Sequence, residues 1–366
     1  MKMRVFLIAI GLLVLLWLAA SPPRFPRTAP RTATIQSEPP TPQTSEPTAQ
    51  TRSVPTAPPI EEPSSPAPTP TNHWRLALLG KDGEIPPVSR EEIERWIALN
   101  HTNADCLLAA RQAGAGREFL LAALEKYPND PRVLFNALTL DDSPEAKRER
   151  LERFKTAAPE NALPEYLSAR EHLKNSQPEL ALQDLLAAAQ KPQFQDYSMD
   201  ATQNAEELYM AAGKSPAEGK ALAAFGVLLP HLAQLKGLAQ DMAALQSQYI
   251  AAGDTSSAET LAQYGLQLSQ QLSTGEGSRY LIDQLVGYAV ERIVLKPLDP
   301  QKNYDFLQGT VQDRFTDLDA KKAEAKQTSQ FLDQWMTTAS DSDLVNYFER
   351  LKVYGEAGAL KWLKQH

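Results

Sequence analysis

The 366-residue sequence contains a single cysteine, Cys106, and only 7% aromatic residues. One cysteine excludes an intrachain disulfide framework and any zinc or iron–sulfur site that is built from several thiolates. The sequence also lacks the glycine-rich phosphate-binding patterns, the G-x-S-x-G nucleophile elbow and the H-E-x-x-H metal motif. We therefore expect no metal, no cofactor and no catalytic residue, and the chain is predicted not to be an enzyme.

Positive charge is scarce as well. The whole chain carries 37 Lys and Arg against 45 Asp and Glu, and after residue 72 the balance becomes 31 against 41. Non-specific affinity for nucleic acid requires clustered basic side chains. The acidic body therefore predicts that nucleic acid is not a partner.

The remaining titratable residues form no recognisable site. Glu171-His172 has no second imidazole one helical turn away, as a metalloprotease motif would require. Cys106 belongs to an apolar helical face, where a buried and unreactive thiol is expected. Asp341 and Asp343 stand at a predicted helix start, where acidic side chains cap the helix and meet its positive dipole end.

The first 20 residues combine a basic start with an apolar run. Lys2 and Arg4 precede sixteen residues without a polar side chain other than one indole, which is the pattern of a secretory signal. Cleavage of a signal requires small residues at two positions before the cleaved bond, and this sequence meets that requirement only imperfectly. Arg24 and Arg27 follow the apolar run, and their long side chains extend to the membrane surface. An uncleaved anchor is favoured over a cleaved signal. For a bacterial source, the body is then anchored at the inner membrane and faces the periplasm, or is secreted to the periplasm if the leader is cleaved.

Residues 21–72 are rich in proline. Fifteen of the 28 prolines lie here, together with 16 Ser or Thr and without a single Lys, Gly, Cys or Trp. Such a composition cannot bury enough apolar surface to offset the entropy of ordering, and proline-rich chains favour the extended polyproline II conformation. The segment is predicted to be a disordered linker that spaces the body from the membrane.

The body, residues 73–366, follows a period near 3.6 and predicts an all-α fold. Ser89-Arg-Glu-Glu92 is a capping box, and Pro131 and Pro144 stand at first-turn positions of helices. Short connections predict antiparallel hairpins between neighbouring helices. Further helices are expected at 162–175, 178–190, 200–212, 216–235, 237–252, 255–273, 278–295, 302–326, 328–338, 341–353 and 356–365.

Small residues within 162–192 suggest a repeat. Ala169, Ala181 and Ala188 are spaced 12 and 7 apart, Leu185 fills a larger slot between them, and Pro192 closes the unit. This pattern resembles the tetratricopeptide repeat (TPR) family. The resemblance is best over 125–192 and implies helical hairpins stacked as an α–α superhelix, with a concave surface for a protein or peptide. The alternative is an irregular helical bundle without true repeats.

These observations divide the chain into a leader (1–20), a linker (21–72), a TPR-like domain (73–275) and a C-terminal helical region (276–366). The favoured function is a membrane-tethered, exported scaffold that binds a protein or peptide. Two alternatives remain open: an all-helical envelope hydrolase acting on glycan or peptide, and a self-associating structural component of the envelope. A cleft holding a Glu of raised pKa favours the hydrolase, whereas a groove lined by polar and aromatic groups favours the scaffold.

Overall fold

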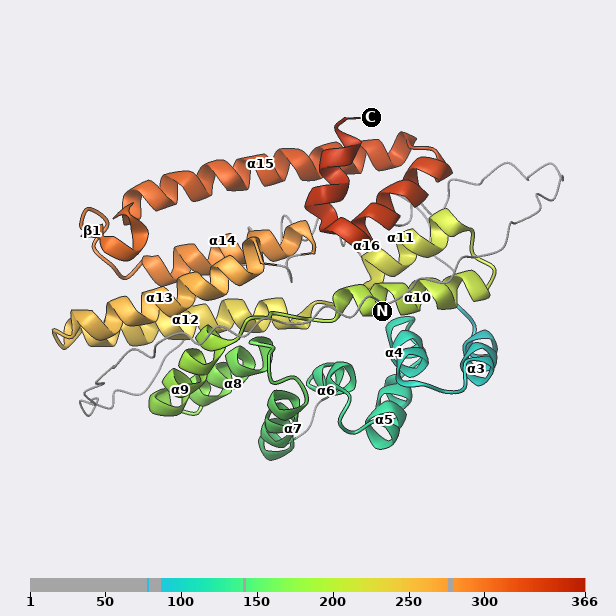
Figure 1. The fold of residues 1–366 in the computed structure, drawn as a ribbon, viewed down its shortest axis with the longest axis horizontal. Helices are drawn as coiled ribbons and strands as arrows, with labels where there is room; N and C mark the ends of the chain where they lie inside the picture. Colours follow the sequence, from blue (N-terminus) through green and yellow to red (C-terminus); the bar gives the residue numbers. More distant parts are fainter. Residues whose placement is uncertain (1–77, 79–86, 141–142, 276–278, 366) are drawn as a thin grey trace, which may run out of the picture.

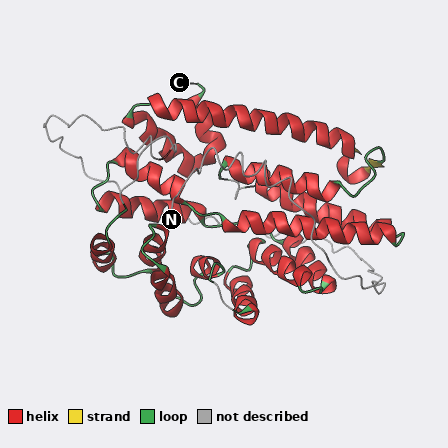
Figure 2. Cartoon of the chain, turned by 180° about the vertical axis from the view of Figure 1, so that it is seen from behind, coloured by secondary structure: helices red, strands yellow, loops and turns green. Residues whose placement is uncertain are grey.

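The computed structural model describes residue 78 and residues 87–140, 143–275 and 279–365. The predicted leader and linker, with Lys2, Arg4, Arg24 and Arg27, lie outside these described residues. Most of the described chain is helix and very little of it is strand (Figure 2), which confirms the predicted all-α fold.

The helices are short in the first half of the described chain and longer in the second. The first set is α3 (Arg90–Leu99), α4 (Ala104–Gln112), α5 (Arg117–Lys126), α6 (Pro131–Ala137), α7 (Pro144–Ala157), α8 (Leu163–Lys174) and α9 (Pro178–Gln190). The second set is α10 (Ser198–Ala211), α11 (Pro216–Gly226), α12 (Pro230–Ala251), α13 (Thr255–Ser273), α14 (Leu281–Leu295), α15 (Val311–Thr338) and α16 (Asp341–Leu363). Two strands, β1 (Asn303–Tyr304) and β2 (Gly309–Thr310), flank a single 3₁₀ turn, η1 (Asp305–Leu307).

Helix starts follow the residues that the sequence marks. Ser89 and Glu92 form a complete capping box at α3, and proline occupies the first turn of α6 and α7 after Asp130 and Ser143, whose side chains accept backbone N–H groups. Proline suits these positions because its missing N–H would have no intrahelical partner there. The predicted starts at Ser89, Pro131 and Pro144 are confirmed.

Helices α3 to α9 form a row in which each helix packs against the next (Figure 1). The chain then reverses. Helix α10 packs against α4, and α12 packs against α8, so the later helices lie across the row instead of extending it. Helices α12, α13 and α14 form a tight three-helix group, and α15 runs along the far side of the molecule from the row (Figure 1).

Close packing within the three-helix group depends on a glycine. A Cβ at Gly287 of α14 would lie 2.8 Å from the carbonyl oxygen of Ser269 and 3.0 Å from the Cβ of Ser273, both on α13. These distances are shorter than van der Waals contact allows. Helices α13 and α14 therefore approach each other as closely as their backbones permit at this point.

Three apolar cores run through the described residues. The largest joins α6 to α9 with α12, α13 and α14 and reaches the hairpin at Tyr304; a second joins α3 to α6 with α10; a third joins α11, α15 and α16. The largest core continues from α13 into α14, across the predicted domain boundary at 275/276. Packing is therefore continuous between the two predicted helical regions.

Three predicted boundaries differ from the structure. The break expected near residue 236 occurs at 227–229, because Pro230 starts α12. Residues 303–310 form the β1–β2 hairpin where a helix was expected, and α15 continues without the expected break near 327. The apolar segment Pro216–Ala251 includes an 18-residue window of mean hydropathy 1.3, of which 61% is buried inside the protein. This segment packs as core helices.

Candidate functional site

The β1–β2 hairpin is the one element in the described chain that departs from helical structure, and it projects at the end of α15 (Figure 1). Tyr304 pairs with Gly309 and Asn303 with Thr310. Gln308 adopts a left-handed conformation with φ of 54°, which closes the turn and leads into the glycine. The chain thereby presents a short polar loop between two helices.

The hairpin is fixed to its surroundings by its aromatic residue. Tyr304 is only 5% exposed, and its hydroxyl accepts the backbone N–H of Asp299 at 3.0 Å. Its ring lies 5.3 Å from that of Phe306, which packs against the largest core. The backbone that carries the exposed side chains beside Tyr304 is therefore fixed in place.

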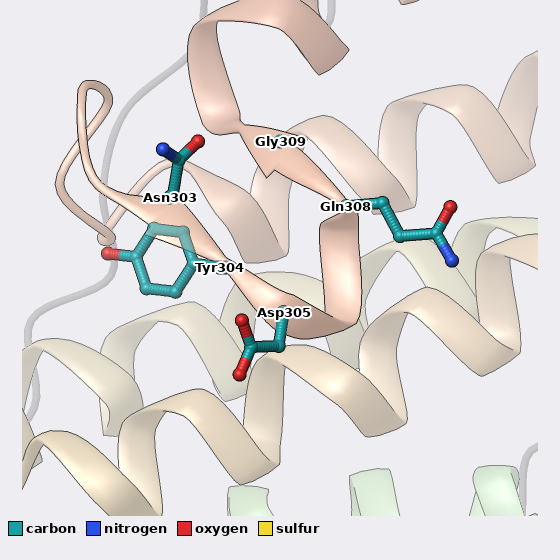
Figure 3. Close-up of a pocket in the computed structure, with 5 residues that line it drawn as sticks. All are labelled: Asn303, Tyr304, Asp305, Gln308 and Gly309. Atoms are coloured by element: carbon teal, nitrogen blue, oxygen red, sulfur yellow. The ribbon is translucent and has the colours of Figure 1, made fainter.

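Two hollows share this hairpin, and both open at the surface. The first, of about 390 Å³, is lined by Asn303, Tyr304, Asp305, Gln308 and Gly309. Figure 3 shows Gln308 extending to the opposite side of the turn from Asn303 and Tyr304. The second hollow, of about 380 Å³, is lined by Glu259, Gln263, Lys302, Asn303, Tyr304, Asp305 and Phe306. Amide, carboxylate, ammonium and aromatic groups thus meet at one place.

A charged pair joins the hairpin to α13. Lys302 Nζ lies 2.7 Å from Glu259 Oε1 and 4.9 Å from the centroid of the Tyr304 ring. The hydrogen bond from Lys302 to Glu259 raises the pKa of that lysine, so the ammonium stays charged. Lys302 is exposed and Glu259 is partly exposed, and an ion pair that is open to solvent contributes little to stability. Its groups remain available to a partner.

The residues that the repeat pattern singled out lie at the α8–α9 contact. Ala169, Ala181, Leu185 and Ala188 are each no more than 1% exposed and belong to the largest core. Pro192 follows α9 and is exposed. The alanines allow the two helices to approach, whereas the proline lies outside their contact.

His172 and Cys106 occupy packed positions in the helical body. His172 Nδ1 is 3.0 Å from Gln177 Oε1, and its Nε2 is 3.5 Å from Asp184. Cys106 is 3% exposed, and burial raises the pKa of its thiol. Within the described ranges, no group of three or more His, Cys, Asp or Glu side chains is arranged to hold a metal ion.

Asp343 forms a capping box with Ser340 at the start of α16, which confirms the capping role predicted for Asp343.

A buried ionic cluster joins α10, α11 and α16. Lys220 contacts both Glu206 and Glu349, and Lys352 Nζ lies 2.9 Å from Glu206 Oε2. Lys220 and Glu206 are each only 7% exposed in their side chains. No sequence pattern indicates this cluster, because its members come from three separate helices.

A second buried group of acids was also missed. Asp196 precedes α10 and lies 3.2 Å from His231 Nε2 on α12. Burial alone would raise the pKa of Asp196, but His231 and the N–H of Ser198 outweigh it and lower that pKa. Burial raises the pKa of Asp283 on α14 well above its usual range, and burial also raises the pKa of Glu356 on α16. No sequence pattern connects these acids, because they come from three separate segments of the chain.

No protein-family model, no curated protein and no solved structure matches this chain. The candidate site therefore stands on its own geometry.

Proposed function

We propose that the chain is a membrane-tethered, exported helical-repeat scaffold that binds a protein or peptide partner in the cell envelope, and that it is not an enzyme. The hairpin with its two hollows is the proposed contact site. Its lining of amide, carboxylate and ammonium groups around an anchored tyrosine is the observation that carries the proposal.

The chemistry of the lining suits a peptide. Asn303, Gln308 and Gln263 each offer an N–H donor and a carbonyl acceptor, which complement the two polar groups of a peptide unit. Glu259 is already paired with Lys302, so the two charges balance at this surface. A partner with polar backbone and mixed charge fits better than a strongly anionic one.

The proposed repeats are separate from this site, whose lining comes from α13 and the β1–β2 hairpin. We regard α8 and α9 as a TPR-like hairpin, because their contact is made by Ala169, Ala181 and Ala188 at the family's small-residue spacing. The neighbouring pairs α4–α5 and α6–α7 pack in the same serial manner. The repeat-like part of the proposal is thus the row α3 to α9.

The membrane tether rests on sequence alone. Lys2 and Arg4 before an apolar run, and the proline-rich residues 21–72, support an exported body held at a distance from the membrane. Cell fractionation tests this: the whole chain should remain with the membrane after an alkaline wash. A variant lacking residues 1–20 should be soluble and folded inside the cell, because its single cysteine needs no oxidant. Aggregation of that variant would contradict the tether.

Both alternatives have less support. The carboxyl groups whose pKa is raised by burial line neither hollow, so a hydrolase would need a different site; they are Asp200, Asp241, Asp283 and Glu356. Leu180 and Leu186 on α9, which are 41% and 48% exposed, are among the exposed apolar side chains that favour self-association. Sedimentation of the purified chain distinguishes the self-associating component from the scaffold, because self-association makes the apparent mass depend on concentration.

Photo-crosslinking tests the contact site. A photoreactive residue at exposed position 303 or 308 should capture the same discrete partner from envelope material, whereas one at exposed position 149 on α7 should not. A synthetic peptide from that partner should then bind the parent and lose affinity for the Asn303→Ala, Gln308→Ala double variant. Capture at 149 alone, or cleavage of glycan or peptide by the purified chain, would overturn the proposal.

A further inference from the structure

Helix α16 contains a hinge. At Gly355 the backbone takes φ of 69° and ψ of 173°, a conformation that interrupts the helix and that residues with a Cβ rarely adopt. The segment that follows, 356–363, is therefore joined to the rest of α16 through one non-helical residue, which we call the hinge.

Beyond the hinge, Glu356 connects this segment to the start of α14. Its backbone N–H donates to the carbonyl oxygen of Arg279 at 2.7 Å. Its carboxylate oxygen Oε2 accepts the N–H of Leu281 at 2.6 Å, and Oε1 accepts the Tyr347 hydroxyl at 3.4 Å. One side chain thus holds the terminal segment against another helix.

The same helix start already has an acid of its own. Asp283 is 2% exposed, and its Oδ2 accepts the N–H groups of Arg279 and Tyr280 at 3.0 and 2.8 Å. A helix N-terminus carries about half a positive charge. That favours one carboxylate there, whereas a second one, on the partly buried Glu356, is repelled by the carboxylate of Asp283.

The groups that face this pair from the surrounding elements are mostly acidic. After burial, the pKa of Asp283 is raised chiefly by Asp196 from the segment before α10, and Glu356 also raises it. Asp333 of α15 contributes to the raised pKa of Glu356. Tyr280 and Tyr347 add phenol groups whose own pKa values are raised by burial, so they stay neutral. The imidazole of His231 faces Asp196.

The docked segment covers an apolar surface. Ala359, Leu360 and Leu363 are at most 8% exposed and share one core with α11, α15 and the first part of α16. Ala217 and Phe348 belong to that core, and release of the segment would expose them to water.

We propose that Glu356 is a proton-controlled latch: one proton held by the Glu356–Asp283 pair keeps residues 356–363 docked, and loss of that proton releases them at Gly355. Glu356 is the member that leaves, because it follows the hinge, whereas Asp283 lies within the first turn of α14. Release uncovers an apolar face formed by α11 and the first part of α16. This device is independent of the proposed partner site on the hairpin.

Hydrogen exchange of the whole chain tests the latch. Protection of amides 359–363, corrected for the intrinsic pH dependence of exchange, should fall as pH rises from mildly acidic to mildly alkaline. The opening constant should increase about tenfold per pH unit wherever the docked form holds one more proton than the released form. Protection in α13 should stay constant over the same range.

Two variants decide the mechanism. Glu356→Gln keeps an oxygen that accepts the Leu281 N–H but carries no charge, and Asp283→Asn does the same for the other member. Each should remove most of the pH slope, while Glu149→Gln on the exposed face of α7 should keep it. If Glu356→Gln does not fold, Asp283→Asn still carries the test. A flat profile in the parent, or an unchanged slope in the variants, would overturn the latch.

Discussion

The side chain of Asn161 holds the backbone of Gln195 from both sides: its Oδ1 accepts the Gln195 N–H at 3.0 Å, and its Nδ2 donates to the Gln195 carbonyl at 2.8 Å. Oδ1 also accepts the N–H of Leu163 at 3.1 Å. These bonds lie where the chain leaves α9 and turns back to α10. A buried amide thereby ties the start of α8 to the segment that reverses the fold.

Asn161→Ala should destabilise the fold by about 1–3 kcal/mol, since it leaves buried backbone groups without partners. The measurement is the free energy of unfolding from chemical denaturation. Asn175→Ala is the matched control, because its amide bonds the Glu171 carbonyl at an exposed helix end and its loss should change stability by about 0.5 kcal/mol or less. Equal effects of the two substitutions would mean that the reversal does not depend on Asn161.

Lys220→Met should be strongly destabilising, because it leaves the buried Glu206 with Lys352 as its remaining cation, and the half-exposed Glu349 competes for that lysine. Removal of one partner of a buried ion pair costs about 3–5 kcal/mol, and Lys352 should reduce that figure. Arg148→Met breaks an exposed pair with Glu145 and should cost less than about 1 kcal/mol.

A double-mutant cycle measures the interaction between Lys220 and Glu206 directly. Glu206→Gln combined with Lys220→Met should be less destabilised than the sum of the two single variants, because the pair interacts directly. Additive effects would show that Lys220 and Glu206 are not coupled.

Gly287→Ala should destabilise the fold, although the same change in an ordinary helix is favourable by about 1 kcal/mol. The added methyl would meet the Ser269 carbonyl oxygen at 2.8 Å, so α13 and α14 would have to separate. Such overpacking costs about 1–3 kcal/mol. At Gly226 the nearest atom is the Tyr209 hydroxyl at 4.0 Å, and Gly226→Ala should be neutral or stabilising in thermal unfolding. A gain in stability for Gly287→Ala would contradict the close approach.

Asp196 should control the acid limb of stability. Burial raises its pKa, but His231 and Ser198 outweigh burial, so the folded pKa is lower than the unfolded one. The stability it contributes is fully present above the unfolded pKa, near 3.9, and is lost as pH falls through the folded pKa. Asp196→Asn should therefore flatten the decline of the denaturation midpoint with acid. A decline as steep as that of the parent would contradict this assignment.

Prolines and capping residues in the sequence predicted where several helices begin. Pro131 and Pro144 stand at helix starts as predicted, because their ring fixes φ and their missing N–H costs nothing at that position. The hairpin at 303–310 escaped prediction, since its strands are two residues long and carry no alternating pattern. The candidate site was therefore found only in the fold.

The sequence by itself determined that the body is helical and where most helices begin, because periodicity, caps and proline act over a few residues. It also determined the small-residue contact of Ala169, Ala181 and Ala188. Tertiary structure alone decided that the row of helices reverses after α9, and that Asp196, Asp283 and Glu356 gather in one buried region. These features depend on contacts between residues tens to more than a hundred positions apart, which no local pattern encodes.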